Sequence, residues 1–412
     1  MSVVQFTQVL SRGCGMDIHK KVVVATVQGE GICKETRSFD TFTRSLTQLR
    51  ERLVSLGITH VAMESTGVYW KPIYNVFEGF IPHIWIVNAR HIKNVPGHKT
   101  DKNDSEWICQ LLMAGLLKPS FIPPKAQREL RDLTRYRRKL IQSVSANKNR
   151  IIRILEDGNI KLSSVLSDTS GATAVKLIDM LCDGKQITLS DIESVRHGRC
   201  QHTKEEMLEA CTGCLDEHKV YMLGKIHECN ASLKEYILDF DKRIKDVLSS
   251  YHDAIERMCE IPGIQNRVCE DLVAEIGLDM SNFPTSAHLC SWAGMCPENN
   301  ESAGKKKSGR TNHGDKQVKE TLVEAAWAAS RAKGTFFMER FNRLAPRKGS
   351  KKALIAVGHS LLKCIHYVLS TGGRYKELGD NYVPNKKEQK RKEYLKKELQ
   401  KLGYSVKLSK ED

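Results

Sequence analysis

The first 120 residues alternate short apolar runs with segments whose apolar residues recur at helical spacing. Short apolar and β-branched runs between polar or glycine residues predict strands, whereas apolar positions three or four residues apart predict helices. On this basis we expect strands at 13–18, 22–28, 32–39, 60–65 and 83–89. We expect helices at 43–57, 68–80 and 101–117. The predicted order is three strands, a helix, a strand, a helix, a strand and a helix.

Four acidic residues lie at particular points of this order. Asp17 lies in the first predicted strand and Glu64 near the end of the fourth, while Asp101 and Asp104 lie in the first turn of the last helix. The two aspartates are three residues apart and therefore share one helix face. Acids at these points of this strand and helix order are the layout of ribonuclease H. We therefore predict an α/β N-terminal domain of the RNase H-like class.

The four carboxylates predict metal-dependent chemistry on a phosphodiester. Mg²⁺ takes oxygen ligands and commonly binds a few carboxylates together with a substrate phosphate. Two such ions can hold both the attacking and the leaving oxygen of a phosphoryl transfer. Four convergent acids would repel one another unless metal neutralised them. An isolated aspartate is more simply explained as a solvated charge, but four acids placed in this order favour a metal site.

The middle of the chain is predicted to be a helical arm. Residues 125–157 have an apolar residue at every third or fourth position and are otherwise rich in charge. The basic residues of this segment include Arg135, Arg137, Arg138, Lys139, Lys148, Arg150 and Arg153. A second long helical run covers about 203–250, and the segment 158–200 between them is short and mixed. Two long helices joined in this way predict an antiparallel arm or coiled coil, which bridges protomers, grips nucleic acid or is merely a solvated helix pair.

The region after Tyr251 begins with a predicted helix, an Ile-Pro-Gly turn and a second helix, within 254–277. This pattern resembles a helix-hairpin-helix, whose turn presents backbone N–H groups to a DNA phosphate. Gln265 stands where the second glycine of such a turn is usual. Simple packing of two helices is the alternative.

A polar segment rich in glycine and lysine follows a short apolar helix and precedes another helix, within 283–330. A serine near glycine, flanked by cations, can attack a phosphate whose charge the cations stabilise. The flanking cations are Lys305, Lys306, Lys307 and Arg310. Judged from the local sequence alone, a basic surface loop with a turn serine is the stronger explanation.

The overall charge agrees with a nucleic-acid partner without requiring one. The chain has 412 residues, with 65 Lys and Arg against 49 Asp and Glu, a formal net charge of +16. Such a balance favours polyanionic partners through counterion release, although a merely basic soluble protein would have it too. No segment approaches a membrane span of about 18 uninterrupted apolar residues, and the N-terminus lacks the pattern of a secretion signal. We therefore expect a cytoplasmic protein without a membrane partner.

The cysteines are expected to be reduced thiols. There are 13, an odd number in a large, lysine-rich chain. One cluster has partial zinc-ligand spacing: Cys200, His202, Cys211, Cys214 and His218, with His227 and Cys229 further on. Because there is no second C-x-x-C and the following segment has the pattern of a continuous helix, we do not expect structural zinc.

Four segments together resemble a known family. They are MESTGVYWKPIYNVFE (63–78), DKNDSEWICQLL (101–112), IPGI…AEIG (261–277) and WAGMCPENNESAGKKKSGR (292–310). They are similar to the DEDD-type transposases of bacterial insertion sequences, the Piv-like serine recombinases guided by a bridge RNA. The resemblance covers about 12–375 and implies three domains. These are a RuvC-like domain (12–124), a helical coiled-coil arm (125–250) and a mostly α-helical C-terminal transposase domain (251–375). The tail (376–412) is rich in Lys and Glu with few large apolar residues, which predicts an exposed helix or a disordered RNA-binding appendage.

The resemblance also implies roles for individual residues. Asp17, Glu64, Asp101 and Asp104 would bind Mg²⁺ or Mn²⁺ and position a scissile phosphate. Ser302 would be the nucleophile that forms a covalent phosphoserine link to a DNA end, helped by the cations at 305–307 and 310. Many members have Ser-Gly at this point, whereas this chain has Ser-Ala-Gly. Ser308, directly before Gly309, is therefore the second candidate, and Ser286 and Ser291 in the apolar helix are poorer ones.

The implied function is a transposase and site-specific recombinase that cuts and rejoins DNA. Its expected partners are the element ends and target DNA, a non-coding guide RNA and further copies of the chain in a dimer or tetramer, in the cytoplasm and at the nucleoid. One alternative is a metal-dependent nuclease of the Holliday-junction type, in which water or a 3′-hydroxyl attacks. A second alternative is a scaffold that binds nucleic acid without catalysis, against which the four placed acids argue.

Overall fold

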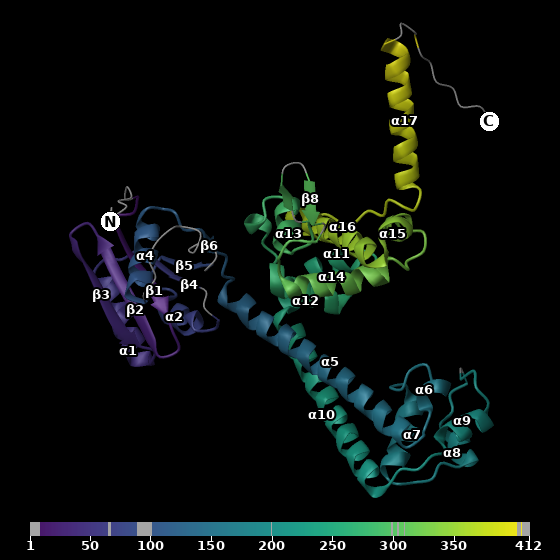
Figure 1. The fold of residues 1–412 in the computed structure, drawn as a ribbon. Coiled ribbons are helices and arrows are strands. Elements are labelled where there is room, and N and C mark those ends of the chain that lie inside the picture. The colour runs from purple at the N-terminus through teal and green to yellow at the C-terminus, as the bar shows by residue number, and fades with distance from the viewer. Residues whose placement is uncertain are drawn as a thin grey trace. The chain divides into compact units, whose positions relative to one another are not determined.

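The computed structural model divides the chain into two compact units, Met1–Pro123 and Pro124–Asp412 (Figure 1). It describes residues 9–64, 67–88, 101–198, 200–297, 300–302, 305–308, 310–401 and 405. For residues 101–103, 300–302, 305–308 and 383–390 it describes the backbone alone.

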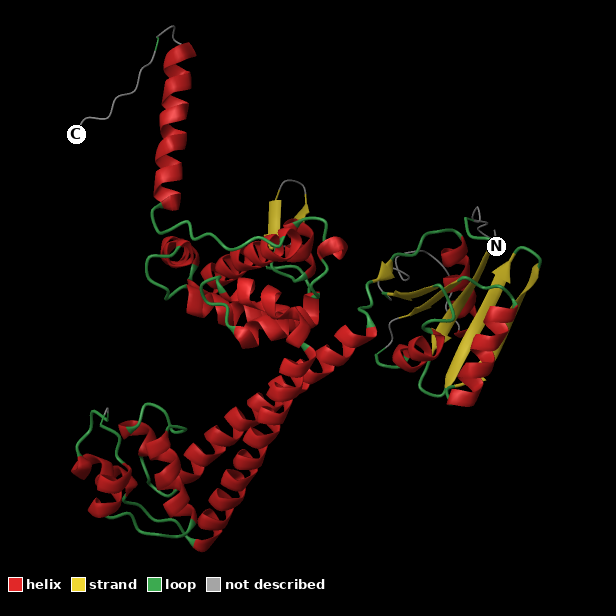
Figure 2. Cartoon of the chain, turned by 180° about the vertical axis from the view of Figure 1, so that it is seen from behind, coloured by secondary structure: helices red, strands yellow, loops and turns green. Residues whose placement is uncertain are grey.

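The first unit is built on a six-stranded mixed sheet with strand order β3-β2-β1-β4-β5-β6. Its strands are drawn in yellow in Figure 2. The strands are β1 (Arg12–Ile18), β2 (Val22–Gly29), β3 (Ile32–Asp40), β4 (His60–Glu64), β5 (His83–Val87) and β6 (Pro119–Ser120). The strands β1, β2 and β3 form an antiparallel meander. β4 lies parallel to both β1 and β5, and β6 closes the edge antiparallel to β5. Parallel neighbours end at the same sheet edge, which brings the ends of β1 and β4 together.

Helices cover both faces of this sheet. Alternate residues of a strand point to opposite faces, and Cys14 and Met16 of β1 pack in one core with Leu46 and Leu49 of α1 (Thr43–Ser55). The same core takes in α2 (Trp70–Phe77) through its buried residues. On the opposite face, Ala62 of β4 packs with residues of α4 (Asp101–Met113). The first unit therefore has three layers, with the sheet in the middle.

Two glycines of β1 allow α4 to lie directly on the strand. A Cβ atom at Gly15 would lie 2.2 Å from the backbone nitrogen of Cys109 and 2.5 Å from the carbonyl oxygen of Ser105. A Cβ atom at Gly13 would lie 2.8 Å from the sulfur of Met113. The helix therefore runs antiparallel to β1, with its first turn toward the end of the strand that carries Asp17.

The prediction of an N-terminal mixed α/β domain is confirmed at the level of sheet and helices. All five predicted strands are present, and the short β6 is an addition that the sequence analysis did not foresee. The helix predicted over 101–117 ends earlier, at Met113, because the chain turns at Gly115, whose φ is +68°. The strand predicted over 83–89 ends at Val87, and residue 89 lies outside the described residues.

The second unit is mostly helical and contains the predicted antiparallel arm (Figures 1 and 2). Its long helices are α5 (Lys125–Asp157) and α10 (Glu217–Val247). Leu130 near the start of α5 shares a core with Ile244 near the end of α10. Leu155 near the end of α5 shares a second core with Leu223 near the start of α10. The two helices therefore run in opposite directions.

The segment between these helices is a small helical body, not the short mixed linker that we predicted. Its helices are α6 (Leu162–Val165), α7 (Ala172–Cys182), α8 (Leu189–Val195) and α9 (Lys204–Cys211). The prediction of one continuous helical run over 203–250 is wrong as well. After α9 the chain breaks, and α10 begins where Asp216 accepts a 2.8 Å hydrogen bond from the backbone nitrogen of Lys219.

The remaining elements surround or follow α16 (Ser350–Thr371), the central helix of a shared core. They are η1 (Ser249–Tyr251), α11 (His252–Cys259), α12 (Asn266–Ile276), η2 (Met280–Asn282), α13 (Ser286–Trp292), β7 (Asn300–Ser302), β8 (Lys305–Ser308), α14 (Lys316–Ala329), α15 (Phe336–Lys348) and α17 (Tyr382–Lys401). By length and hydropathy α16 alone among the described helices matches a membrane span. Its Leu361, Leu362 and Ile365 are fully buried in this core, which accounts for its apolar character. The tail that we predicted as a helix or a disordered appendage contains the helix α17.

Four arginines of α5 form ion pairs with other helices of the unit, and one of them, Arg131, pairs with Glu275. Arg137 is 1% exposed and lies between carboxylates of α10 and α12, with Asp241 Oδ1 and Asp271 Oδ1 both at 2.8 Å and Glu270 in contact. Burial alone would lower the pKa of the Arg137 guanidinium, but the carboxylates of Glu270 and Asp271 raise it. The two other arginines pair similarly, Arg135 with Glu275 and Arg138 with Glu320. These ion pairs hold α5 against the neighbouring helices. Binding of nucleic acid by α5 would therefore depend on its other cations.

Candidate functional site

Asp17 and Glu64 lie at the ends of two neighbouring parallel strands. The last paired residues of β1 and β4 are Met16 and Met63, and each acid is the next residue of its strand. Met16 and Met63 belong to the core under α1, so by alternation both acids point to the opposite face. That face is the one that α4 covers.

The neighbourhood of Asp17 is largely closed to solvent. Asp17 is 6% exposed, and its Oδ2 lies 3.0 Å from Nε2 of His19, whose side chain is half exposed. A buried carboxylate needs a partner that compensates for lost hydration, and the imidazole is one such partner here. His19 was not among the residues predicted from the sequence. Its only signal is a histidine two residues after an acid at a strand end, which is too common a pattern to single out.

Hydrogen bonds fix the first turn of α4 on the sheet. The hydroxyl of the fully buried Ser105 lies 2.8 Å from that of Thr26 in β2, and Thr26 lies 2.9 Å from Thr36 in β3. Glu106 forms an ion pair with Lys34. Asp104, directly before Ser105, is partly buried in this turn. The backbone of Asp101 begins the helix, and its side chain lies outside what the structure describes.

The sheet and α4 therefore bring the backbones of the four predicted acids to one region. Asp17 and Glu64 end adjacent strands, and Asp101 and Asp104 belong to the helix turn that lies beyond Gly15 on the same face. A set of carboxylate oxygens on such a face is chemically suited to a hard divalent cation.

The segment of Ser302 forms a β-hairpin, whereas we predicted a loop. β7 and β8 pair antiparallel, with Ser302 opposite Lys305. The side chains of Ser302, Lys305, Lys306, Lys307 and Ser308 lie outside the described residues, so their interactions stay untested. Arg310 is exposed just after β8. The hairpin gives Ser302 a defined backbone position at the end of a short strand.

The base of this hairpin is held against α13 and α14. Pro297 and Thr311 form an isolated antiparallel bridge that continues the ladder of the hairpin. The side-chain amide of Asn312 donates a 2.7 Å hydrogen bond to the carbonyl oxygen of Ser291. A Cβ atom at Gly314 would lie 2.1 Å from the backbone nitrogen of Gly294, so the two strands of chain touch there. Ser291 is exposed and Ser286 partly buried, both in α13.

The Ile-Pro-Gly turn joins α11 and α12 as predicted, and its glycine is used for packing. Gly263 has a φ of +84°, and a Cβ atom there would lie 2.5 Å from the carbonyl oxygen of Ala325 in α14. Ile261 and Ile264 on either side are buried in the core. These contacts favour the helix-packing interpretation of the segment over a phosphate clamp.

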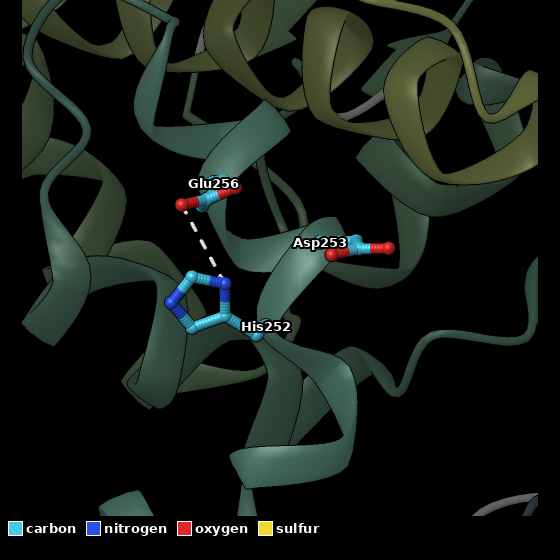
Figure 3. Close-up of side chains that lie close together, drawn as sticks. All are labelled: His252, Asp253 and Glu256. Carbon is cyan, nitrogen blue, oxygen red and sulfur yellow. Dashed lines mark ion pairs between the residues drawn. The ribbon is translucent and has the colours of Figure 1, made fainter.

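The Cys and His residues considered for zinc do not gather into a metal site among the described residues. Cys211 is buried in the apolar core between α7 and α9, where burial raises its pKa to about 11, while Cys214 is exposed. Within the described part of the chain one group has metal-ligand atoms close together, His252, Asp253 and Glu256 of α11. Figure 3 shows His252 paired with Glu256, and the Asp253 carboxylate takes no part in this ion pair. All three are exposed on one helix turn, as solvated charges commonly are.

Two protein-family models match separate segments of the chain. Residues 14–160 match the IS110-type DEDD model described as a transposase, and this range spans all four acids. Residues 255–341 match the model of the transposase IS116/IS110/IS902 family, and this range spans the serine hairpin. Among curated proteins, none matches the chain significantly. The chain thus carries IS110-family DEDD transposase and IS116/IS110/IS902 transposase domains, which support a DNA-binding transposase enzyme of an insertion sequence.

Proposed function

We propose that this transposase cuts and rejoins DNA through a covalent phosphoserine intermediate at Ser302, with a divalent-cation site at Asp17, Glu64, Asp101 and Asp104. The proposal includes an RNase H-like (RuvC-like) identity for the first unit, which the strand order β3-β2-β1-β4-β5 with acids after β1 and β4 supports. It also includes a non-coding guide RNA and a dimer or tetramer.

One observation gives the main support for the proposed metal site. Asp17 and Glu64 end adjacent parallel strands on the face of the sheet that α4 covers, next to the helix turn of Asp104. Oxygen donors from three elements suit Mg²⁺ or Mn²⁺, which would supply Lewis-acid stabilisation of the charge on the scissile phosphate. The protein residues would hold this arrangement rigid: Ser105 ties α4 to β2, and His19 lies against Asp17.

The serine step is a transesterification. The Ser302 Oγ forms a bond to phosphorus, its proton leaves, and the bond from phosphorus to one DNA oxygen breaks with protonation of that oxygen. A DNA hydroxyl then attacks the same phosphorus and releases the serine. One phosphodiester is exchanged for another in each direction, so no external energy source is needed. Lys305, Lys306, Lys307 and Arg310 would bind the phosphates of the strand and stabilise the developing charge.

The acids are tested by conservative substitution. Asp17→Asn and Glu64→Gln should abolish DNA cleavage in Mg²⁺ while leaving the circular dichroism spectrum unchanged, because each change removes a metal-ligand charge without changing shape. Glu51→Gln is the control, since Glu51 is an exposed acid of α1 on the other face of the sheet. Full cleavage by both variants, or by the wild type in excess chelator, would refute the metal site.

The serine is tested by trapping the adduct. Ser302→Ala should bind DNA normally and form no covalent protein–DNA band on a denaturing gel, whereas Ser308→Ala should still form it. The reverse result moves the nucleophile to Ser308. Cleavage by the wild type with no adduct would favour the alternative, a metal-dependent nuclease or transposase in which water or a 3′-hydroxyl attacks.

A further inference from the structure

A cavity of about 280 Å³ lies where the arm meets the small helical body. Its apolar wall includes Ile151 of α5 with Val175 and Ile178 of α7. All of its lining residues belong to the second unit. It is remote in sequence from both the acids and the serine hairpin, and the proposed chemistry does not use it.

Two residues that line this cavity each carry a buried polar atom with no hydrogen-bond partner among the described residues. The atoms are the side-chain carbonyl oxygen of Asn230, in α10, and the hydroxyl of Ser170, just before α7. Asn230 is 6% exposed. Buried polar groups are almost always hydrogen-bonded, because an unmade bond leaves the cost of desolvation uncompensated. An acceptor and a hydroxyl that both lack protein partners, on residues that line one cavity, point to a ligand with complementary polar atoms.

Two lysines line the cavity, and the carboxylates of Asp168 and Asp179 are each bound to one of its lining residues. Lys148 of α5 and Lys234 of α10 both line it, and neither has a carboxylate within ion-pair distance in the described part of the chain. The ring of His227 also lines it and is held at 2.7 Å by the carboxylate of Asp179. A ligand that joins an apolar, hydrogen-bonding body to an anionic group matches this distribution.

We propose that this cavity binds one nucleotide unit. The base would lie against the apolar wall, an N–H of its edge would donate to Asn230, and the hydroxyl of Ser170 would bond to the same edge. The phosphate would lie at the two lysines. Ligand pockets commonly have volumes of about 300–1,000 Å³, so a cavity at the lower limit suits a single base.

The nucleotide has two possible sources, an unpaired nucleotide of a nucleic-acid strand or a free nucleotide. The inference rests on the proposed function for the first source, because a nucleic-acid transposase handles strands with unpaired bases. Proteins that bind single strands hold such bases by stacking and by contacts to the base edge. The arm would then contribute a base-binding site in addition to phosphate contacts.

The full-length chain provides the test. A fluorescein-labelled mixed-sequence 12-nucleotide RNA is titrated and followed by polarisation, and the four ribonucleoside monophosphates are titrated separately by calorimetry. Asn230→Leu should lower the affinity for the oligonucleotide about tenfold or more, because it fills the cavity and removes the acceptor. Lys234→Ala should weaken binding, whereas Lys242→Ala, an exposed lysine two turns further along the same helix, should weaken it less. Asn230→Leu should melt no lower than the wild type, since it removes an unpaired buried polar atom.

The outcomes distinguish an unpaired nucleotide of a strand from a free nucleotide. They also distinguish failure of the cavity proposal from failure of the proposed function. If a monophosphate displaces the oligonucleotide from the wild type but not from the Asn230→Leu variant, the result supports the site and shows that a free nucleotide suffices. Binding of the strand alone, lost in Asn230→Leu, supports an unpaired nucleotide as the ligand. Wild-type affinity of the Asn230→Leu variant for every probe overturns the inference. That result would leave the proposed function intact if Asp17→Asn still abolished cleavage.

Discussion

Replacing Gly15 by alanine should displace α4 without changing any acidic side chain. The substitution therefore tests whether the position of α4 matters for cleavage. The new Cβ atom would lie 2.2 Å from the nitrogen and 2.7 Å from the Cα atom of Cys109, and 2.5 Å from the carbonyl oxygen of Ser105. All three are backbone atoms of α4, so no side-chain rotation can relieve the contact. The helix must therefore move away from β1 by about 1 Å to restore ordinary van der Waals distances.

The substitution should lower both the stability of the protein and the rate of DNA cleavage. Overpacking of this kind typically destabilises a protein by about 1–3 kcal/mol, which urea denaturation would measure. The larger effect should be on cleavage, because a misplacement of about 1 Å in a catalytic arrangement can lower the rate about 10²-fold. Asp104 belongs to the helix that moves, whereas Asp17 and Glu64 belong to strands that stay.

Gly13→Ala is the matched control, on the same strand and the same face. Its nearest atoms are the sulfur of Met113 at 2.8 Å and a methyl group of Leu112 at 3.2 Å, both of which belong to flexible side chains. This variant should therefore keep most of its DNA cleavage in Mg²⁺. Equal losses in the two variants, or wild-type cleavage by Gly15→Ala, would refute the argument that close backbone contact positions the helix.

The remaining predictions concern the second unit and the charge of the chain. Arg137→Met should lower the free energy of unfolding by about 3–5 kcal/mol in a denaturant titration, because it leaves the carboxylates of Asp241, Glu270 and Asp271 without their buried cation; a loss under 1 kcal/mol would contradict this. Gly314→Ala should reduce formation of the covalent DNA adduct while DNA binding persists, since its Cβ atom would displace the base of the serine hairpin. DNA affinity should fall by about 10³-fold or more between roughly 50 and 200 mM salt, and a flat response in a filter-binding titration would argue against extensive phosphate contacts.

The strands of the first unit could be predicted because each strand has a recognisable pattern within its own residues. Apolar alternation and turn residues define β1 to β5, and α1 and α4 follow from helical spacing. The same alternation places Asp17 and Glu64 on one face, given that β1 and β4 are parallel neighbours. The short β6 carries no such signal, because two residues are too few to show a period.

The role of Arg137 could not be predicted from sequence. In the sequence it is one of several basic residues of a charged helix, and such a helix suggests a solvated or nucleic-acid-binding face. Its partners are 104, 133 and 134 residues further along the chain. A pattern within one helix cannot reveal a pairing at that distance. The small helical body after α5 was missed for a related reason, since its short helices are stabilised by a shared core that only the fold assembles.

In each unit, a close contact between two backbone segments determines where the candidate residues lie. In the first unit, β1 and α4 touch at Gly15. In the second unit, the two ends of the hairpin segment touch at Gly294 and Gly314. At both places backbone meets backbone at a distance that admits no Cβ atom, so the geometry tolerates no gradual adjustment. The residues that determine where the acids and the serine lie are therefore these glycines, although glycine has no functional group to contribute. Substitutions there should impair activity without touching any group that reacts.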